Sequence, residues 1–312
     1  MTKVLPDITR RAFVASAAAA GAAVSLPAAP ARAVRASARS RPIPKSGEML
    51  PVIGMGTWIT FNVGRVTPLR EARLQVLKNF FDMGGRVVDS SPMYGSAEAV
   101  IGWCMERLKG NRKQLFSATK VWTSSGSRGR EQIAASQKLW GLPKLDLEQV
   151  HNLLSWEEHL ETLLAMKERG RLRYVGITTS HGSRHGDIAR IMESKPIDFV
   201  QLTYNAIDRE AEARLLPLAA ERKIAVIVNR PFRGGPLIDA MKRHKLPAWA
   251  ADFDADNWAQ FLLKFIVSHP AVTCTIPATS KVAHMRENMG ALHGRLPDPA
   301  MRKRIAQYVE GL

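Results

Sequence analysis

From residue 51 onward, the chain repeats one pattern eight times: a short run of β-branched and apolar residues, then a longer amphipathic run of helical period. The runs typical of strands lie at residues 52–56, 86–90, 115–121, 147–152, 174–178, 199–204, 225–229 and 272–277. Strict alternation of strand and helix favours a parallel sheet, because each parallel crossover needs a long connection. Eight such units in fewer than 280 residues favour a closed (β/α)8 barrel.

The helices are expected between these strands, at residues 69–83, 97–108, 130–139, 157–169, 187–193, 211–222, 257–269 and 281–292. A doubly wound open sheet is the alternative α/β fold, and it normally carries a glycine-rich phosphate-binding turn after its first strand. Gly54 and Gly56 begin such a turn, but Ile59 stands where the third glycine is needed. The sequence therefore predicts a TIM barrel rather than an open sheet.

Three segments fall outside the repeat. Residues 42–48, which include a Lys45-Ser46-Gly47 turn, are expected to form an N-terminal β-hairpin over the barrel floor. Residues 298–310 are expected to form an extra C-terminal helix. The connection at 230–256 is the longest in the chain, which makes it a candidate lid over a functional site.

Residues 1–33 have the features of an export signal rather than of a folded segment. The pair Arg10-Arg11 is followed by Phe13, an alanine-rich stretch runs to about residue 30, and residues 31–33 form a small-x-small cleavage pattern. This order resembles the twin-arginine class of signals, whose passengers are typically exported already folded. We therefore expect a signal peptide at 1–33, recognised by the twin-arginine export machinery, and one barrel domain at 34–312 in the periplasm or otherwise outside the cytoplasm. A low-complexity alanine linker is the alternative.

Composition narrows the class of partner. Only two cysteines are present, so a disulfide framework is not expected. The net charge of +17 falls to +14 without residues 1–33, and such a surface attracts anions. The basic residues are scattered along the expected helices without interleaved aromatic residues, so nucleic-acid binding is not expected. Because no segment is long and apolar enough to span a bilayer, no stable membrane anchor is expected either.

Ionisable residues end three consecutive expected strands. Asp89, Lys120 and His151 follow one another at steps of 31 residues, one strand-and-helix unit each. The carboxyl ends of the strands carry the active site in this type of barrel. We therefore expect an acid, a base and an imidazole to meet at one rim.

Each of these residues also has an ordinary structural explanation. Asp89 suits a turn, and His151 suits a satisfied core position. Lys120 is harder to explain in this way, because it ends an apolar strand and a buried ammonium needs a counter-ion. Asp89, one strand away, is the candidate counter-ion.

Tyr94 follows Asp89 by five residues and completes a candidate proton donor. The pKa of a free tyrosine is about 10, and a nearby ammonium favours the phenolate and lowers that value. We expect Asp89 to hold Lys120, Lys120 to lower the pKa of Tyr94, and His151 to steer a substrate oxygen toward the phenol. This arrangement predicts general acid catalysis on a carbonyl group.

Several motifs agree in order with those of one known family. They are PVIGMGTW (51–58), Asp89-Ser-Ser-Pro-Met-Tyr94-Gly-Ser-Ala-Glu98 followed by Gly102, SATKVW (117–122), DLEQVH (146–151), GRLRYVG (170–176), IP (276–277) and EN (287–288). On these motifs the chain resembles the aldo-keto reductase family over residues 42–310.

The resemblance implies an NADP-dependent carbonyl reductase or alcohol dehydrogenase, which moves a hydride between C4 of a nicotinamide and a small aldehyde or ketone. It implies that Tyr94 is the general acid, that Asp89 and Lys120 tune it, and that His151 orients the carbonyl. It also implies NADP(H) as the cofactor, bound without a Rossmann domain.

The resemblance further implies where the cofactor binds. Thr279, Ser280 and Lys281 would hold the adenosine 2'-phosphate at a helix N-terminus, although a simple helix cap is the alternative there. Gln201 would contact the nicotinamide amide, and Asn288 the adenine. The remaining expected cofactor residues are Gly56, Thr57, Trp58, Thr178, Thr179, Arg230 and His284.

The chain departs from the family pattern at several of these positions. Thr178-Thr179 replaces a Ser-Asn pair that binds the amide in many relatives, and Asn229-Arg230 stands where many carry a tyrosine against the nicotinamide. We leave open whether Arg230 stacks on that ring or binds the pyrophosphate. Ala278 and His284 replace a lysine and an arginine of some relatives, so the preference for NADPH over NADH is open.

Two other classes of function remain as alternatives. One is a non-catalytic nucleotide-binding redox sensor or accessory subunit on the same barrel. The other is a metal-dependent hydrolase using His151, His181 and His185, but no carboxylate pair accompanies these histidines, and we expect no metal. The substrate, the oligomeric state and the way in which an exported cofactor is reduced are not predicted by the sequence.

Overall fold

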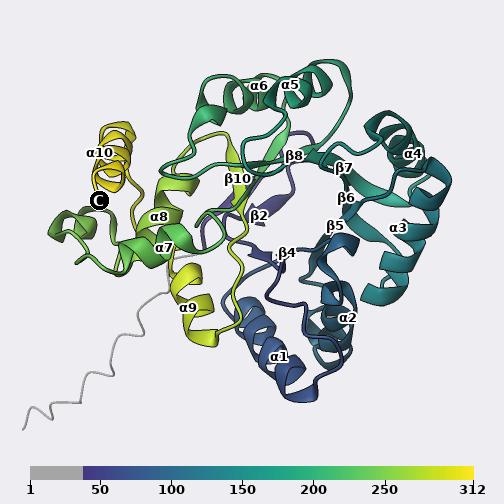
Figure 1. Ribbon diagram of the computed structural model, residues 1–312, viewed down its shortest axis with the longest axis horizontal. Coiled ribbons are helices and arrows are strands. Elements are labelled where there is room, and N and C mark those ends of the chain that lie inside the picture. Colours follow the sequence, from purple (N-terminus) through teal and green to yellow (C-terminus); the bar gives the residue numbers. More distant parts are fainter. Residues whose placement is uncertain (1–37) are drawn as a thin grey trace, which may run out of the picture. The chain divides into compact units, whose positions relative to one another are not determined.

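Eight parallel strands form the barrel, which confirms the predicted (β/α)8 fold (Figure 1). The computed structural model describes residues 38–312, so the expected signal at 1–33 lies outside the described residues. The strand order follows the sequence from β3 to β10. The strands are β3 (Met55–Gly56), β4 (Val87–Asp89), β5 (Phe116–Val121), β6 (Leu145–His151), β7 (Leu172–Thr178), β8 (Phe199–Thr203), β9 (Ala225–Asn229) and β10 (Val272–Thr275).

The first and last strands close the barrel through short bridges. Ile53 pairs with Thr275, and Gly56 pairs with Ala278. A Cβ atom on Gly56 would lie 2.8 Å from the backbone oxygen of Ile276, so only glycine permits this approach. The glycines that begin an incomplete dinucleotide-binding pattern in the sequence therefore serve the closure of the barrel.

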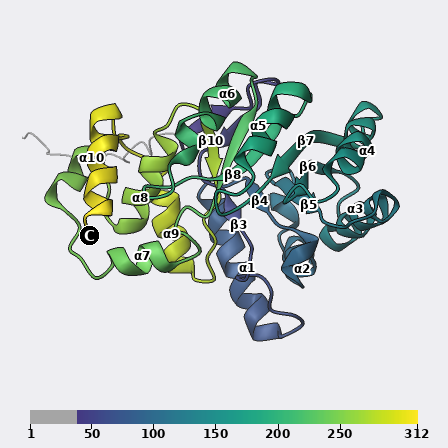
Figure 2. The same cartoon turned by 45° about the horizontal axis from the view of Figure 1, so that its top comes forward.

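Helices alternate with the strands and surround the barrel (Figure 2). They are α1 (Thr67–Asp82), α2 (Ala97–Arg107), α3 (Gly126–Trp140), α4 (Trp156–Glu168), α5 (His185–Ser194), α6 (Leu215–Glu221), α8 (Trp258–Val267) and α9 (Val282–Gly290). The helix expected at 211–222 is divided into a 3-10 turn (Glu210–Glu212) and α6, because Pro217 is tolerated only in the first turn of a helix. Within residues 38–312, no helix has the length and apolar character needed to cross a bilayer.

A β-hairpin covers the barrel floor, as predicted. Its strands are β1 (Ser40–Pro42) and β2 (Met49–Pro51), so the predicted segment 42–48 is mainly the turn between them. Ile43 and Leu50 of the hairpin are fully buried in one cluster with inward-facing barrel residues such as Phe116 and Phe199. Glu48 accepts a hydrogen bond from the hydroxyl of Tyr174, 2.8 Å away, which ties the turn to β7. The lower half of the barrel interior is therefore an apolar core.

The long connection at 230–256 contains helical structure that the sequence did not predict. It carries α7 (Pro236–Met241) and a 3-10 helix (Ala248–Phe253). The buried ammonium of Lys264 in α8 donates to the backbone oxygens of Phe253 and Asp254, at 2.9 and 2.7 Å. The ring of Trp249 packs edge-on against Tyr308 of the predicted C-terminal helix, α10 (Pro299–Glu310). The far half of the connection is thus anchored away from the barrel mouth.

Gly102 allows α2 and α3 to approach closely, which gives a stability prediction. A Cβ atom on Gly102 would lie 1.8 Å from the backbone oxygen of Leu139, so the helices must separate in Gly102→Ala. We expect this substitution to lower the free energy of unfolding by about 3 kcal/mol in chemical denaturation. The control is Gly186→Ala in α5, where a Cβ atom meets nothing within 4 Å and alanine favours the helix. Equal stabilities of the two variants would contradict the prediction.

Candidate active site

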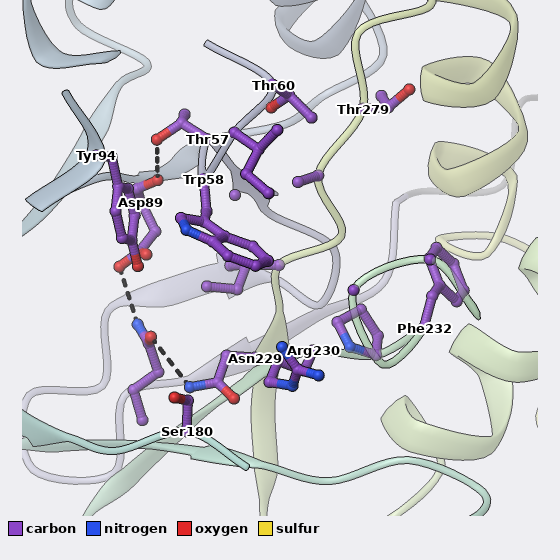
Figure 3. A pocket seen from close by; sticks show the side chains of 18 of the residues that line it. Thr57, Trp58, Thr60, Asp89, Tyr94, Ser180, Asn229, Arg230, Phe232 and Thr279 are labelled. Atoms are coloured by element: carbon purple, nitrogen blue, oxygen red, sulfur yellow. Dashed lines mark hydrogen bonds between the residues drawn. The ribbon is translucent and has the colours of Figure 1, made fainter. Parts of the chain in front are cut away.

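A cavity of about 340 Å³ opens at the carboxyl ends of the strands. Figure 3 shows Tyr94 and Asp89 on one side of it, Arg230 and Asn229 on another, and the indole of Trp58 between them. Most of the residues proposed from the sequence line this cavity, whereas Lys120, Ser280 and Lys281 do not. The predicted residues that line it are Gly56, Thr57, Trp58, Asp89, Tyr94, His151, Thr178, Thr179, Gln201, Arg230, Thr279, His284 and Asn288.

Asp89 and Lys120 form a buried ion pair, as predicted from the strand spacing. Lys120 Nζ lies 2.6 Å from Asp89 Oδ1, and the Lys120 and Asp89 side chains are 0% and 2% exposed. The same ammonium donates to the backbone oxygen of Ser90 at 2.6 Å. Burial alone would lower the pKa of Lys120, but the charge of Asp89, together with Tyr94, raises it above its usual value. The lysine therefore remains an ammonium.

Tyr94 ends the 3-10 turn Pro92–Tyr94 that follows β4. The hydroxyl of Ser91 accepts a hydrogen bond from the backbone N–H of Met93 and caps this turn. Gly95 follows with φ of 62°, a conformation that glycine adopts without strain. This local sequence brings the ring of Tyr94 to a position 5.0 Å from Lys120 Nζ, measured to the ring centroid.

The expected lowering of the pKa of Tyr94 is wrong as a net effect. Burial raises the pKa of this phenol more than Lys120 lowers it, and the charge of Asp89 raises it further. Lys120 does act in the predicted direction, but the water-poor environment outweighs it. The phenol is therefore fully protonated at neutral pH, which is the state that a proton donor needs.

His151 ends β6 and faces Tyr94. The two rings meet edge-on, with centroids 5.8 Å apart. Burial, assisted by the charge of Lys120, lowers the pKa of His151 to about 3, so the imidazole is neutral at physiological pH. Its Nδ1 atom lies 2.9 Å from the hydroxyl of Ser91. When that hydroxyl donates, the second ring nitrogen carries the proton and can donate to a substrate oxygen.

Two buried amides extend the ion pair into a polar network. The Nε2 atoms of Gln201 and Gln149 lie 2.9 and 3.2 Å from Asp89 Oδ2. The sequence interpretation placed Gln201 against a cofactor amide and did not include Gln149. The sequence did contain a signal for Gln149, because it is a polar residue within a buried strand and stands two positions before His151.

Thr178 ends β7 and Thr179 follows it, and both threonines lie beside this network. Thr178 donates from its hydroxyl to Gln201 Oε1 at 3.2 Å, and the backbone oxygen of Thr179 accepts from Asn229 Nδ2 at 2.8 Å. The hydroxyl of Thr179 donates to the backbone oxygen of Ser183 at 2.9 Å. Amide donors and acceptors from three strand ends are thus gathered on one wall of the cavity.

Arg230 lies at the mouth of the cavity with φ of 50°, in the left-handed region. Its guanidinium donates to the backbone oxygen of Arg233 at 3.0 Å, and it has no ion-pair partner in the part of the chain that the structure describes. Both Arg230 and Trp58 lie within 4 Å of the position that a Cβ atom on Gly234 would occupy. The guanidinium is therefore available to an anion or a ring in the cavity, and the choice between these two uses stays open.

The N-terminus of α9 meets the requirements of a phosphate site. Lys281 occupies the N-cap position, and its side chain makes no capping hydrogen bond. Thr279 precedes it and accepts a hydrogen bond from the backbone N–H of Lys281 at 3.1 Å. Because the first-turn N–H groups of the helix lack a side-chain cap, they suit an anionic group. His284 and Asn288 of the same helix line the cavity.

The histidines after β7 do not gather with His151 into a metal site. Nδ1 of His181 lies 2.8 Å from the hydroxyl of Ser180 at the cavity edge. Nε2 of His185 is buried and has no hydrogen-bond partner among the described residues. Over residues 38–312, no cluster of three or more histidine, cysteine, aspartate or glutamate residues has a geometry that could hold a metal ion.

Comparisons with known proteins identify a family and several relatives. A family model described as the Aldo/keto reductase family matches residues 52–307. The chain is 26% identical over 238 residues to an uncharacterised oxidoreductase, C215.11c, of Schizosaccharomyces pombe, in a match that covers 71% of this chain and 74% of that protein. It is 27% identical over 204 residues to the aldo-keto reductase YhdN of Bacillus subtilis, in a match that spans 61% of this chain and 60% of YhdN.

Solved structures share the fold. An aldo-keto reductase from Klebsiella pneumoniae, described as a complex with NADPH, superposes with a TM-score of 0.73 at 20% identity, covering 88% of this chain and 96% of that one. The holo form of aldo-keto reductase AKR11C1 from Bacillus halodurans gives a TM-score of 0.71 at 20% identity, covering 87% and 96%. At this identity the likeness establishes the shared barrel.

The buried state of His151 predicts a pH dependence of stability. The imidazole has a pKa of 6.5 when unfolded and about 3 when folded, so the unfolded state gains the proton first as the pH falls. This contribution lowers the free energy of unfolding progressively from about pH 6.5 toward pH 3, by about 1.4 kcal/mol per unit. The variant His151→Gln has no imidazole and therefore lacks this pH-dependent contribution. We expect the stability difference between wild type and this variant to change over that range in chemical denaturation, and parallel curves would contradict the assignment.

Proposed function

The chain belongs to the aldo/keto reductase family, and we propose that it is an oxidoreductase that transfers a hydride between NADP(H) and an aldehyde or ketone. One observation carries this proposal. The buried pair of Asp89 and Lys120 lies beside a protonated Tyr94 and a neutral His151 at one cavity. These are the groups that protonation of a carbonyl oxygen requires.

Several features of the cavity support NADP(H) as the cofactor. When bound, its nicotinamide supplies or accepts the hydride. We propose that Thr279, Ser280 and Lys281, at the uncapped start of α9, hold the 2'-phosphate, and that Asn288 contacts the adenine. The amide wall formed by Thr178, Thr179 and Gln201 suits the nicotinamide carboxamide, and Gly56, Thr57, Trp58, Arg230 and His284 complete the proposed binding surface.

The proton moves between Tyr94 and the substrate oxygen. In reduction, the phenol gives its proton to the carbonyl oxygen as the carbonyl carbon receives the hydride, and a phenolate remains. The ammonium of Lys120 stabilises that phenolate, because it is charged, buried and close to the ring. The neutral His151 donates a hydrogen bond to the same substrate oxygen and fixes its position. Oxidation of an alcohol uses the same groups in reverse.

The part of the cavity near Tyr94 suits an uncharged substrate. Met93, next to Tyr94 in the chain, and Ile59 line the cavity and are 43% and 64% exposed, so large apolar side chains are open to a substrate there. The lining cations Arg230 and Lys242 come from the 230–256 connection instead. We propose that small carbonyl compounds with an apolar group are preferred over carboxylated ones, and matched pairs of aldehydes with and without a carboxylate measure this through KM.

Replacing the proposed acid tests the mechanism. Tyr94→Phe removes the transferable proton and keeps the ring, so we expect kcat to fall by about a thousandfold while the Kd for NADPH stays unchanged. The matched control is Tyr308→Phe. Tyr308 belongs to α10 and does not line the cavity, so this variant should retain activity. Unchanged turnover in Tyr94→Phe would refute the assigned acid. Nucleotide binding without turnover of any carbonyl by the wild type would instead favour the redox-sensor alternative.

We also propose that the protein is exported through the twin-arginine pathway on the strength of residues 1–33. A folded passenger can carry its nucleotide with it, so the exported protein is expected to contain bound NADP(H). In the full-length chain, the double substitution Arg10→Lys and Arg11→Lys should leave the protein in the cytoplasmic fraction, whereas Lys3→Arg should not. Equal distribution of the two variants after cell fractionation would overturn the proposed signal.

A further inference from the structure

The two carboxylate oxygens of Asp89 have different partners. Oδ1 binds the ammonium of Lys120 at 2.6 Å, whereas Oδ2 accepts from Gln201 Nε2 at 2.9 Å and from Gln149 Nε2 at 3.2 Å. All four side chains belong to residues that are at most 2% exposed. Asp89 and Gln201 also line the cavity, whereas Lys120 and Gln149 do not, and the orientation of the carboxylate depends on these partners.

Gln149 is held between two neighbouring strands. In the strand register, it pairs with Lys120 on one side and with Gly176 on the other. A Cβ atom on Gly176 would lie 2.8 Å from the backbone oxygen of Phe199 and 3.2 Å from Gln149 Cγ, so the absent side chain leaves space for both neighbours. Gln149 Oε1 also accepts from Gln201 Nε2 at 3.3 Å, so both ends of its amide are used. Gln149 does not line the cavity, and it therefore acts on ligands only through its neighbours.

The orientation of Asp89 determines where Lys120 can donate. An ammonium has three N–H groups. Two of them are used by Asp89 Oδ1 and by the backbone oxygen of Ser90. The third remains for the oxygen of Tyr94. If the carboxylate turned and offered both oxygens to the lysine, the ammonium would lose that direction.

We propose that Gln149 is a positioning residue that, together with Gln201, holds Asp89 Oδ2 and so keeps the ammonium of Lys120 directed at Tyr94. The proposal rests on the role assigned to Tyr94 in the proposed function. It also gives the two amides different duties. Gln201 lines the cavity and can exchange one of its partners for the amide of a ligand. Gln149 is fully buried and does not line the cavity, so its hydrogen bond to Asp89 is kept when a ligand binds.

The substitution Gln149→Met removes the donor and keeps the length of the side chain. The matched control is Leu147→Met, two residues earlier on β6 and in the apolar cluster of the barrel interior. The first measurement is the phenolate absorbance of the ligand-free protein as a function of pH. The chain has four tyrosines, so the curve of each protein is compared with that of its Tyr94→Phe counterpart to isolate Tyr94.

We expect Gln149→Met to move the titration of Tyr94 to higher pH by about half a unit or more, because Asp89 can then turn and the ammonium of Lys120 is less well placed to stabilise the phenolate. We expect kcat to fall about tenfold, the effect of one hydrogen bond to a charged group. The Kd for NADPH should not change. Leu147→Met should leave the titration and kcat at their wild-type values.

A titration curve and a kcat for Gln149→Met that match those of Leu147→Met would overturn the proposal. If Gln149→Met does not fold, Gln149→Asn retains an amide that is one methylene too short to reach Asp89, and the same shift is expected of it. The titration needs neither cofactor nor substrate. A protein that reduces no carbonyl therefore refutes the proposed function but still allows the role of Gln149 to be judged.

Discussion

The buried ammonium of Lys120 is the constraint on which the interior of this barrel depends. A charge removed from water requires a counter-ion and further hydrogen bonds, since desolvation of both ions is costly. Asp89 and the backbone oxygen of Ser90 meet this requirement directly, and two glutamine amides donate hydrogen bonds to the second carboxylate oxygen of Asp89. The barrel interior is consequently divided into an apolar lower half, closed by the β1 and β2 hairpin, and a polar upper half below the cavity.

The same burial gives the cavity its chemistry. Desolvation raises the pKa of Tyr94 and lowers that of His151, so both groups are neutral at physiological pH. The phenol can then lose a proton and the imidazole can donate a hydrogen bond, while the charge at the centre of the site stays with Asp89 and Lys120. One water-poor environment therefore sets the protonation states of Tyr94 and His151, whereas Asp89 keeps Lys120 charged against it, and only the phenol needs to change during the reaction.

The fold and the core of the site were predictable because both follow from local periodicity. Strand and helix alternation identified all eight strands, and the constant step of 31 residues brought Asp89, Lys120 and His151 to one rim. Features that depend on contacts across the barrel were missed. The role of Gln149 depends on the register of β5, β6 and β7, and the net pKa shift of Tyr94 depends on burial by distant segments. The helix in the 230–256 connection was missed because its six residues are too few for a periodic signal.

Two further buried acids, Glu98 and Glu148, interact with Lys120 without serving as its counter-ion. Glu98 accepts hydrogen bonds from Thr119, Ser136 and Trp140, whereas neither carboxyl oxygen of the fully buried Glu148 has a partner among the described residues. Burial raises the pKa of both carboxyls, and the charge of Glu98 raises that of Glu148 further, whereas Lys120 lowers both. Lys120 is hydrogen-bonded to Asp89 on the inner side of the wall. Asp89, and not the acids behind β6, is therefore the counter-ion that holds the ammonium beside Tyr94.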